Sequence, residues 1–173
     1  MIIAWDPGNS GGFAVKEGGV IHVVPMHDDE SMLIGFLKSL HDRGHRTVWY
    51  ESQTYCTGVR VSAFTMGRFG EGLGFCRGVM AAIGFNIIPV TPQAWQKHLG
   101  IQKGEKMKKN KGMTQAERDA VDAHNAPLKV KWKNDLKEAA IKFFGGKLTL
   151  KTADAVLVLK YAIEKEIANG TKR

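Results

Sequence analysis

Three acidic residues stand at the borders of apolar segments, where carboxylates are uncommon. They are Asp6 after the run Met1–Trp5, Glu51 after Thr47–Tyr50, and Asp154 before Ala155–Leu159. A carboxylate beside a hydrophobic core is disfavoured unless it is paired or binds a metal. Each position also has an ordinary explanation, because an acid that ends a strand can begin a turn and an acid at a helix start is favoured by the helix dipole.

Taken together, the three acids favour a metal site over three separate structural roles. Carboxylate oxygens are the ligands that Mg²⁺ and Mn²⁺ prefer. Two such ions about 3.5–4 Å apart can activate a water molecule and stabilise the leaving oxygen of a phosphodiester. The residue types and their order along the chain therefore predict a centre for phosphodiester chemistry.

The first half of the chain predicts how two of these acids meet. Three short strands, at residues 1–5, 11–15 and 20–25, form an antiparallel meander with turns at residues 7–10 and 18–19. Apolar residues at helical spacing between Met32 and Leu40 follow, with N-cap candidates at residues 28–31 and an end near Gly44. A fourth strand then ends at Glu51. If this strand lies parallel to the first, both acids reach the carboxyl edge of the sheet, where open α/β sheets bind ligands.

The second half predicts further helices around one more strand. We expect a glycine-rich helix over 62–83, an edge strand over 86–90 that contains Pro89, and a short helix capped by Thr91 with Pro92 in its first turn. Residues 102–112 read as a mobile basic linker. A capping box at Thr114–Glu117 starts a helix that Pro127 should end, and further helices cover 132–144 and 149–168. The expectation is one α/β domain over residues 1–173, with a basic loop and helical insertion at about 101–128.

Composition points to a polyanionic partner. The net charge is +8 at pH 7 over 173 residues, and five lysines fall between residues 103 and 111. No apolar run approaches the roughly 20 residues of a transmembrane helix, and residues 1–30 lack the pattern of a signal peptide. Two cysteines are too few for a disulfide framework. We therefore expect a cytoplasmic protein with no membrane association.

These residues resemble the RuvC-type Holliday junction resolvases of the ribonuclease H-like superfamily. The resemblance is carried by Asp6 before Pro-Gly, by Glu51 at the end of the fourth strand, and by the helix that contains TADAVLVL (residues 152–159). The TPQAW stretch (residues 91–95) and the basic insertion are more similar to phage-encoded members. The resemblance implies a five-stranded mixed sheet in the order β-β-β-α-β-α-β-α, flanked by helices.

The resemblance also implies an activity. Such enzymes are homodimeric endonucleases that nick four-way DNA junctions using two Mg²⁺ or Mn²⁺ ions, and leave 5′-phosphate and 3′-hydroxyl ends. Carried over, Asp6 would bridge both ions, Glu51 would bind one and Asp154 the other. The partners would be branched DNA and a second copy of the chain, with no small-molecule substrate. If the protein is phage-encoded, it would act in the host cytoplasm.

Lys151 departs from the family pattern, because members commonly carry an acid or a histidine there. A protonated lysine cannot bind a metal, so one ion should bind weakly. Lys151 could instead hold the scissile phosphate or stabilise developing charge. The alternative is an ordinary solvated lysine at a helix start.

Further residues are predicted to contact DNA or the partner subunit. Tyr55 is a candidate for stacking on unpaired bases, and its alternative is a half-exposed loop tyrosine. The phosphate-contact candidates are Arg60, Arg68, Arg77, Lys103, Lys106, Lys108, Lys109 and Lys111. The candidate dimer face of the glycine-rich helix consists of Gly67, Gly70, Gly74 and Gly78. Those glycines could equally allow close packing on the chain's own sheet.

The sequence is also compatible with three other functions. A ribonuclease H-like protein with a weak or inactive site would bind nucleic acid without cutting it, and Lys151 favours that alternative. A related nuclease could prefer a flap or another branched substrate. Asp6 and the glycine- and serine-containing turn after it (DPGNSGG, residues 6–12) also fit the phosphate loop of the actin and sugar-kinase superfamily. Such ATP-binding proteins need a second domain and well over 300 residues.

Overall fold

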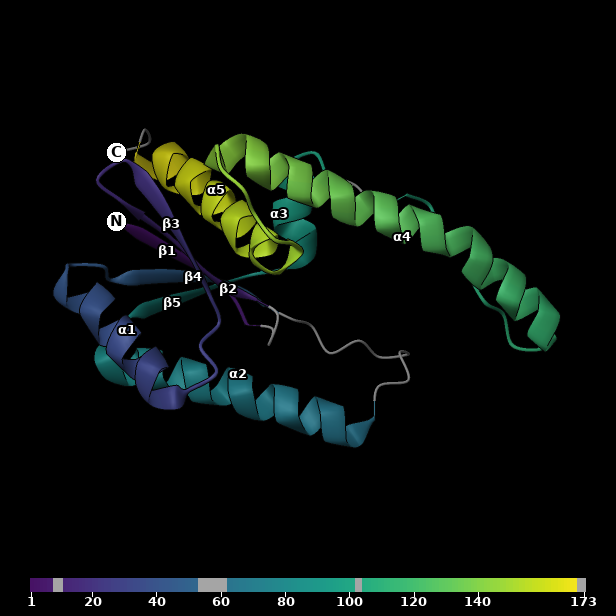
Figure 1. Cartoon of the computed structure of the whole chain (residues 1–173), viewed down its shortest axis with the longest axis horizontal. Coiled ribbons are helices and arrows are strands. Elements are labelled where there is room, and N and C mark those ends of the chain that lie inside the picture. The colour runs from purple at the N-terminus through teal and green to yellow at the C-terminus, as the bar shows by residue number, and fades with distance from the viewer. Residues whose placement is uncertain (8–10, 53–61, 102–103, 171–173) are drawn as a thin grey trace.

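A five-stranded mixed sheet forms the middle layer of the computed structural model, with helices on both of its faces (Figure 1). The structure describes residues 1–7, 11–52, 62–101 and 104–170. The elements are β1 (Ile2–Asp6), β2 (Gly12–Glu17), β3 (Val20–Pro25), α1 (Glu30–Asp42), β4 (Thr47–Glu51), α2 (Ala63–Ile83), β5 (Asn86–Val90), α3 (Pro92–His98), α4 (Gln115–Phe144) and α5 (Leu150–Gly170). The predicted fold class and element order are confirmed.

The strand order is β3-β2-β1-β4-β5. The first three strands are antiparallel neighbours, whereas β4 lies parallel to β1 and β5 lies parallel to β4. The carboxyl ends of β1, β4 and β5 therefore share one edge of the sheet. Pro89 lies in β5 at the border of the sheet, as predicted, where a residue without an N–H can be accommodated.

Alternation along the strands divides the core between the two faces of the sheet. Ile3 and Trp5 of β1 pack toward α1 and α2, and Ile2 and Ala4 pack toward α3, α4 and α5. Helix α5 is the central element of the second face. It is buried from Ala155 to Leu159 and packs on β1, β2 and β4. An apolar run with no polar stripe fits a helix that is covered on almost every side.

Helix α4 corrects the prediction that Pro127 ends a helix. The two amphipathic runs form one helix of 30 residues with Pro127 inside it. Pro127 is exposed, so water can satisfy the carbonyl that loses its helical partner. The C-terminal half is held by Leu136 and Ala140, which are buried against α5. No helix in the described ranges is long and apolar enough to cross a membrane.

Candidate active site and nucleic-acid interface

Asp6 and Glu51 end neighbouring parallel strands. The register between β1 and β4 pairs Trp5 with Tyr50, so the next position along brings Asp6 beside Glu51. Neighbouring strands lie about 4.8 Å apart. Both acids belong to the face that carries α5, because Trp5 and Tyr50 belong to the opposite core. Glu51 is buried, with 7% of its surface exposed, and Asp6 is half-buried.

Gly11 packs directly against Asp6. A Cβ atom added at Gly11 would lie 2.2 Å from the Asp6 carbonyl oxygen and 2.8 Å from the Asp6 carboxyl carbon. Neither distance is possible for a real side chain. Gly12 is similarly close to β3, where a Cβ would lie 2.4 Å from the Val24 carbonyl oxygen. Gly11 therefore lets the backbone between β1 and β2 approach Asp6, and Gly12 lets β2 approach β3.

Trp95 holds the second acid. Its indole Nε1 donates a buried hydrogen bond of 2.9 Å to Oε2 of Glu51. Trp95 is fully buried in α3, which begins immediately after β5. An indole N–H can only donate, so the carboxylate oxygen is the acceptor of this bond. The contact fixes the orientation of the Glu51 carboxylate at the edge of the sheet.

Asp154 lies on α5, in a different setting from the strand acids. The helix begins at Leu150, so Asp154 falls in its second turn and not in the first turn that the sequence predicted. The helix-dipole explanation is correspondingly weaker, because that effect falls off within the first turn. Asp154 lines a small hollow between α4 and α5, together with Trp132 and Leu136. Figure 1 shows α5 running opposite to β1, with its N-terminal end over the carboxyl edge of the sheet.

The described residues contain no group of three or more His, Cys, Asp or Glu side chains that could hold a metal ion. The structure therefore brings Asp6 and Glu51 together at one edge but does not assemble them with Asp154 into a closed ligand set. Two adjacent carboxylates above a glycine backbone still fit a hard divalent cation, which takes oxygen ligands and commonly keeps several waters. By donor chemistry, Asp6 and Glu51 fit as a pair, and Asp154 fits as a ligand from the helix above.

Four predicted residues cannot be placed in this site. Tyr55, Arg60 and Lys103 lie outside the described residues. Lys151 is the second residue of α5, and its side chain also lies outside the described part of the chain. Their predicted roles stay predictions.

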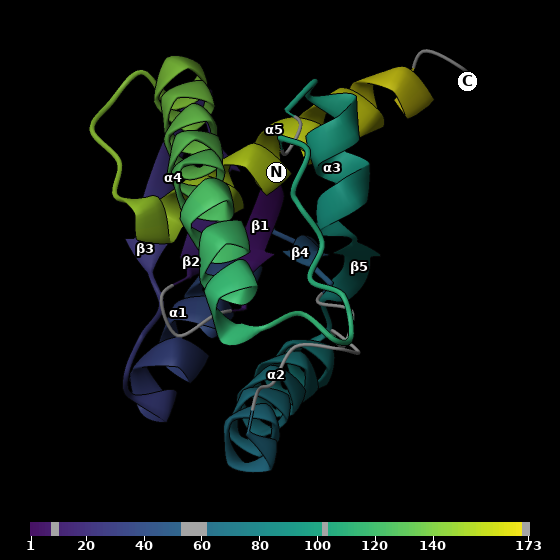
Figure 2. The same cartoon turned by 90° about the vertical axis from the view of Figure 1, so that its right-hand side faces the viewer.

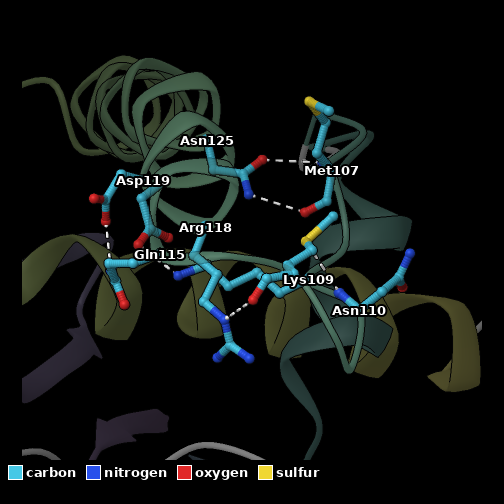
Figure 3. A network of polar contacts seen from close by, with 9 residues as sticks. Met107, Lys109, Asn110, Gln115, Arg118, Asp119 and Asn125 are labelled. Carbon is cyan, nitrogen blue, oxygen red and sulfur yellow. Dashed lines mark hydrogen bonds and ion pairs between the residues drawn. The ribbon is translucent and has the colours of Figure 1, made fainter.

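The basic segment is attached to α4 and is not the free linker that the sequence predicted. We call residues 104–113 the basic strap. The Asn125 side chain accepts from the Met107 N–H at 3.0 Å and donates to the Met107 carbonyl at 3.0 Å (Figure 3). Arg118 donates from Nε to the Met113 carbonyl at 3.2 Å, and Lys109 pairs with Asp122. These bonds hold the strap along the N-terminal half of α4.

The strap lysines differ in their surroundings. Residues 104–112 are all exposed, including Lys106, Lys108 and Lys111. Lys109 is exposed as well, but its ammonium pairs with Asp122. The strap thus offers three exposed lysines and one whose charge is already matched. Figure 2 looks onto the carboxyl edge of the sheet, with α4 on one side of it and α2 on the other.

Arg68 and Arg77 lie on α2, and each stacks on an aromatic ring. The Arg68 guanidinium is 5.8 Å from the centre of the Phe64 ring, and the Arg77 guanidinium is 5.6 Å from the centre of the Tyr50 ring. Phe64 is 74% exposed, so the Phe64–Arg68 pair is an aromatic and cationic surface open to solvent. The sequence contained both residues but gave no sign that Phe64 would be exposed.

The glycine face of α2 is open. A Cβ atom added at Gly67, Gly70, Gly74 or Gly78 would meet no described atom within 4 Å. Packing on the chain's own sheet therefore does not explain these glycines. The buried residues that α2 adds to the core on this face of the sheet are Cys76 and Met80.

Two residues of this region were missed by reasoning from the sequence. Trp95 is part of the TPQAW stretch, and the cap at Thr91 could have shown that α3 turns back over the preceding strand. Asn125 follows the capping box at helical spacing, but no pattern in the sequence identifies the backbone group that it binds. Trp95 and Asn125 both act through contacts between segments that are distant in sequence.

The chain matches no protein-family model and no curated protein sequence. Its structure is similar to that of RuvC from Thermus thermophilus, with a TM-score of 0.53, 14% sequence identity, and coverage of 96% of each chain. A second similar structure is T. thermophilus RuvC in complex with a Holliday junction substrate, with a TM-score of 0.53, 14% identity, and coverage of 91% of this chain and 89% of that one. The chain therefore has a RuvC-like, ribonuclease H-like fold.

Proposed function

We propose that this RuvC-like fold carries a metal-dependent endonuclease that cuts branched DNA, with the four-way junction as its principal substrate. The observation that carries the proposal is the placement of Asp6 beside Glu51 at the carboxyl edge of parallel strands. Support comes from the fold, which this chain shares with a protein solved on a Holliday junction substrate. The +8 charge fits a polyanionic substrate.

Asp6, Glu51 and Asp154 would hold Mg²⁺ or Mn²⁺, with Asp6 shared between two ions. Bound there, divalent metal supplies Lewis acidity and lowers the pKa of water for phosphodiester hydrolysis. Asp6 and Glu51 present their carboxylates from a rigid sheet edge, which reduces the reorganisation needed during the reaction. The products would be nicks with 5′-phosphate and 3′-hydroxyl ends. Lys151, on the first turn of α5, would bind the scissile phosphate.

The strap and α2 would bind the DNA on either side of the acids. Lys106, Lys108 and Lys111 are exposed and would contact phosphates without reading sequence. Tyr55, Arg60, Arg68, Arg77, Lys103 and Lys109 complete the proposed set. Two junction strands need two centres, so the proposed unit is a homodimer joined through Gly67, Gly70, Gly74 and Gly78 of α2.

The test separates cutting from binding. Wild-type protein with Mg²⁺ should convert a synthetic four-way junction into nicked duplexes. Asp6→Asn keeps the shape of the side chain and removes its charge, so it should bind the junction with unchanged affinity in the absence of metal and fail to cut. Asp28→Asn, which alters an exposed acid before α1, should cut like the wild type.

A second candidate is a DNA-binding protein of the same fold that does not cut. The observation that favours it is the missing three-ligand cluster among the described residues. Wild-type protein that binds the junction but leaves it intact in both Mg²⁺ and Mn²⁺ would establish this second function and exclude the first.

A further inference from the structure

We propose that the indole N–H of Trp95 positions the Glu51 carboxylate for metal binding, which makes Trp95 a positioning residue of the site. The inference rests on the proposed function, because it assumes that Glu51 binds a metal. It adds a residue that touches neither the metal nor the DNA, and that acts through Glu51 alone.

The contact has the properties that a positioning role needs. The Nε1 to Oε2 distance is 2.9 Å, and both side chains are buried, at 0% exposure for Trp95 and 7% for Glu51. An indole N–H can only donate and does not titrate, so the bond holds its direction at every working pH. It uses one of about four lone-pair positions on the carboxylate, so this bond does not by itself prevent the group from acting as a ligand.

The backbone fixes where Trp95 stands relative to Glu51. Glu51 pairs with Val90 across β4 and β5, and the Ser52 N–H donates to the Val90 carbonyl at 2.7 Å. One residue later the Thr91 side chain caps α3 by accepting from the Ala94 N–H at 3.2 Å. The chain thus turns at Thr91, directly after the residue paired with Glu51. Helix α3 then places Trp95 over the end of β4.

Trp49 provides an internal comparison on the same strand. Its indole donates to Glu166 at a longer distance of 3.4 Å, at an exposed position on α5. That bond joins a half-buried tryptophan to an exposed acid, and Trp49 lies at neither end of β4. If the Trp95–Glu51 and Trp49–Glu166 contacts both contributed only to packing, removal of the indole N–H at either tryptophan would have the same effect on metal affinity.

The experiment compares Trp95→Phe with Trp49→Phe by calorimetric titration of DNA-free protein with Mn²⁺. Loss of a group that orients a metal ligand typically weakens metal affinity by about 10- to 100-fold. We expect a loss of that size for Trp95→Phe and wild-type affinity for Trp49→Phe. In the Glu51→Gln background, Trp95→Phe should cause no further loss, because its effect passes through Glu51.

A smaller ring in a buried site can disturb folding, so a second substitution keeps the shape. Incorporation of 3-benzothienylalanine at position 95 replaces the indole N–H by sulfur and should weaken Mn²⁺ binding as Trp95→Phe does. Wild-type affinity in the sulfur-containing protein would overturn the inference and leave the proposed nuclease intact. A wild-type protein that binds no Mn²⁺ would overturn both.

Discussion

Two uncharged residues hold the two neighbouring acids of the site. Gly11 lies against Asp6, and Trp95 donates to Glu51. Both contacts are present before any ligand arrives, and a preorganised geometry favours electrostatic catalysis. The restraint is steric for Asp6 and a directed hydrogen bond for Glu51, so different substitutions test the two.

Gly11→Ala should move Asp6. The added Cβ would overlap the Asp6 carbonyl oxygen, so either the hairpin or the acid must shift. A displacement of about 1 Å at a catalytic group can lower the rate by about 10²-fold. We expect junction cleavage to fall by at least that factor, as measured in single-turnover assays. Gly35→Ala in α1 is the control, because its Cβ meets no described atom within 4 Å and alanine stabilises a helix by up to about 1 kcal/mol. Equal cleavage by both variants would contradict this role for Gly11.

His45 gives the fold a dependence on pH that is separate from catalysis. It is fully buried, and desolvation lowers the pKa of its imidazole below the usual 6.5. Between that lowered pKa and 6.5 the unfolded chain binds more protons than the folded one, so stability is complete above 6.5 and is lost as the pH falls through this window. Thermal unfolding from pH 7.5 to 5 should show a steeper loss for wild type than for His45→Leu. A matching slope in both proteins would disprove the assignment.

At the scale of elements, α4 is an arm that carries its own basic strap. The Asn125 amide binds both backbone groups of Met107, as a neighbouring strand would, and Gly104 packs against Leu128. The strap is therefore presented in a defined place relative to the carboxyl edge of the sheet. That arrangement would lower the entropy lost in the proposed binding of its lysines to phosphates.

Neutralising strap lysines should change the salt dependence of DNA binding. Each phosphate contact contributes about 0.9 to the slope of log K against log salt. Lys108→Gln with Lys111→Gln should therefore flatten the slope by about 2, whereas Lys109→Gln should do less because Asp122 already matches its charge. Lys38→Gln on α1, in the opposite layer, is the control. An unchanged slope in the double variant would exclude the strap from phosphate contact.

Elements with strong local signals could be predicted from the sequence. The strand Val20–Pro25, the cap at Thr91 and the capping box at Thr114 occur where their residues predict them. Pro127 misled because the cost of a helical proline depends on exposure, which a local pattern does not contain. The pairing of Asp6 with Glu51 followed from strand direction, whereas Trp95 and Asn125 act across distant segments that only the folded structure brings together.

At the scale of the whole molecule, the open glycine face of α2 fits the proposed dimer. Four glycines face open space on one side of a helix, where alanine would be the more stable choice for an isolated chain. In the proposed dimer a second copy of α2 at close range would account for them, because small residues let two helix backbones approach. The proposed dimer would then place two acid pairs on one DNA junction.

Light scattering should give about twice the 19.1 kDa chain mass. Gly74→Leu should reduce the mass to that of a monomer by separating the two helices. Gly72→Leu is the matched control, since Gly72 is also open but projects from another side of α2. A monomeric wild type at high concentration would exclude the proposed dimer. A dimeric Gly74→Leu variant would exclude the glycine face of α2 as its interface.

The sheet edge that carries Asp6 and Glu51 is proposed to cut branched DNA. The direct measurement is cleavage of end-labelled four-way junctions, flaps, forks and linear duplexes by the wild-type protein in Mg²⁺ and in Mn²⁺, with the product ends mapped. We predict paired nicks in the four-way junction with 5′-phosphate and 3′-hydroxyl ends, little cutting of linear duplex, and none by Asp6→Asn. Equal cutting of every substrate would contradict the proposed selectivity for branched DNA. Cutting by the Asp6→Asn variant would contradict the proposed role of Asp6.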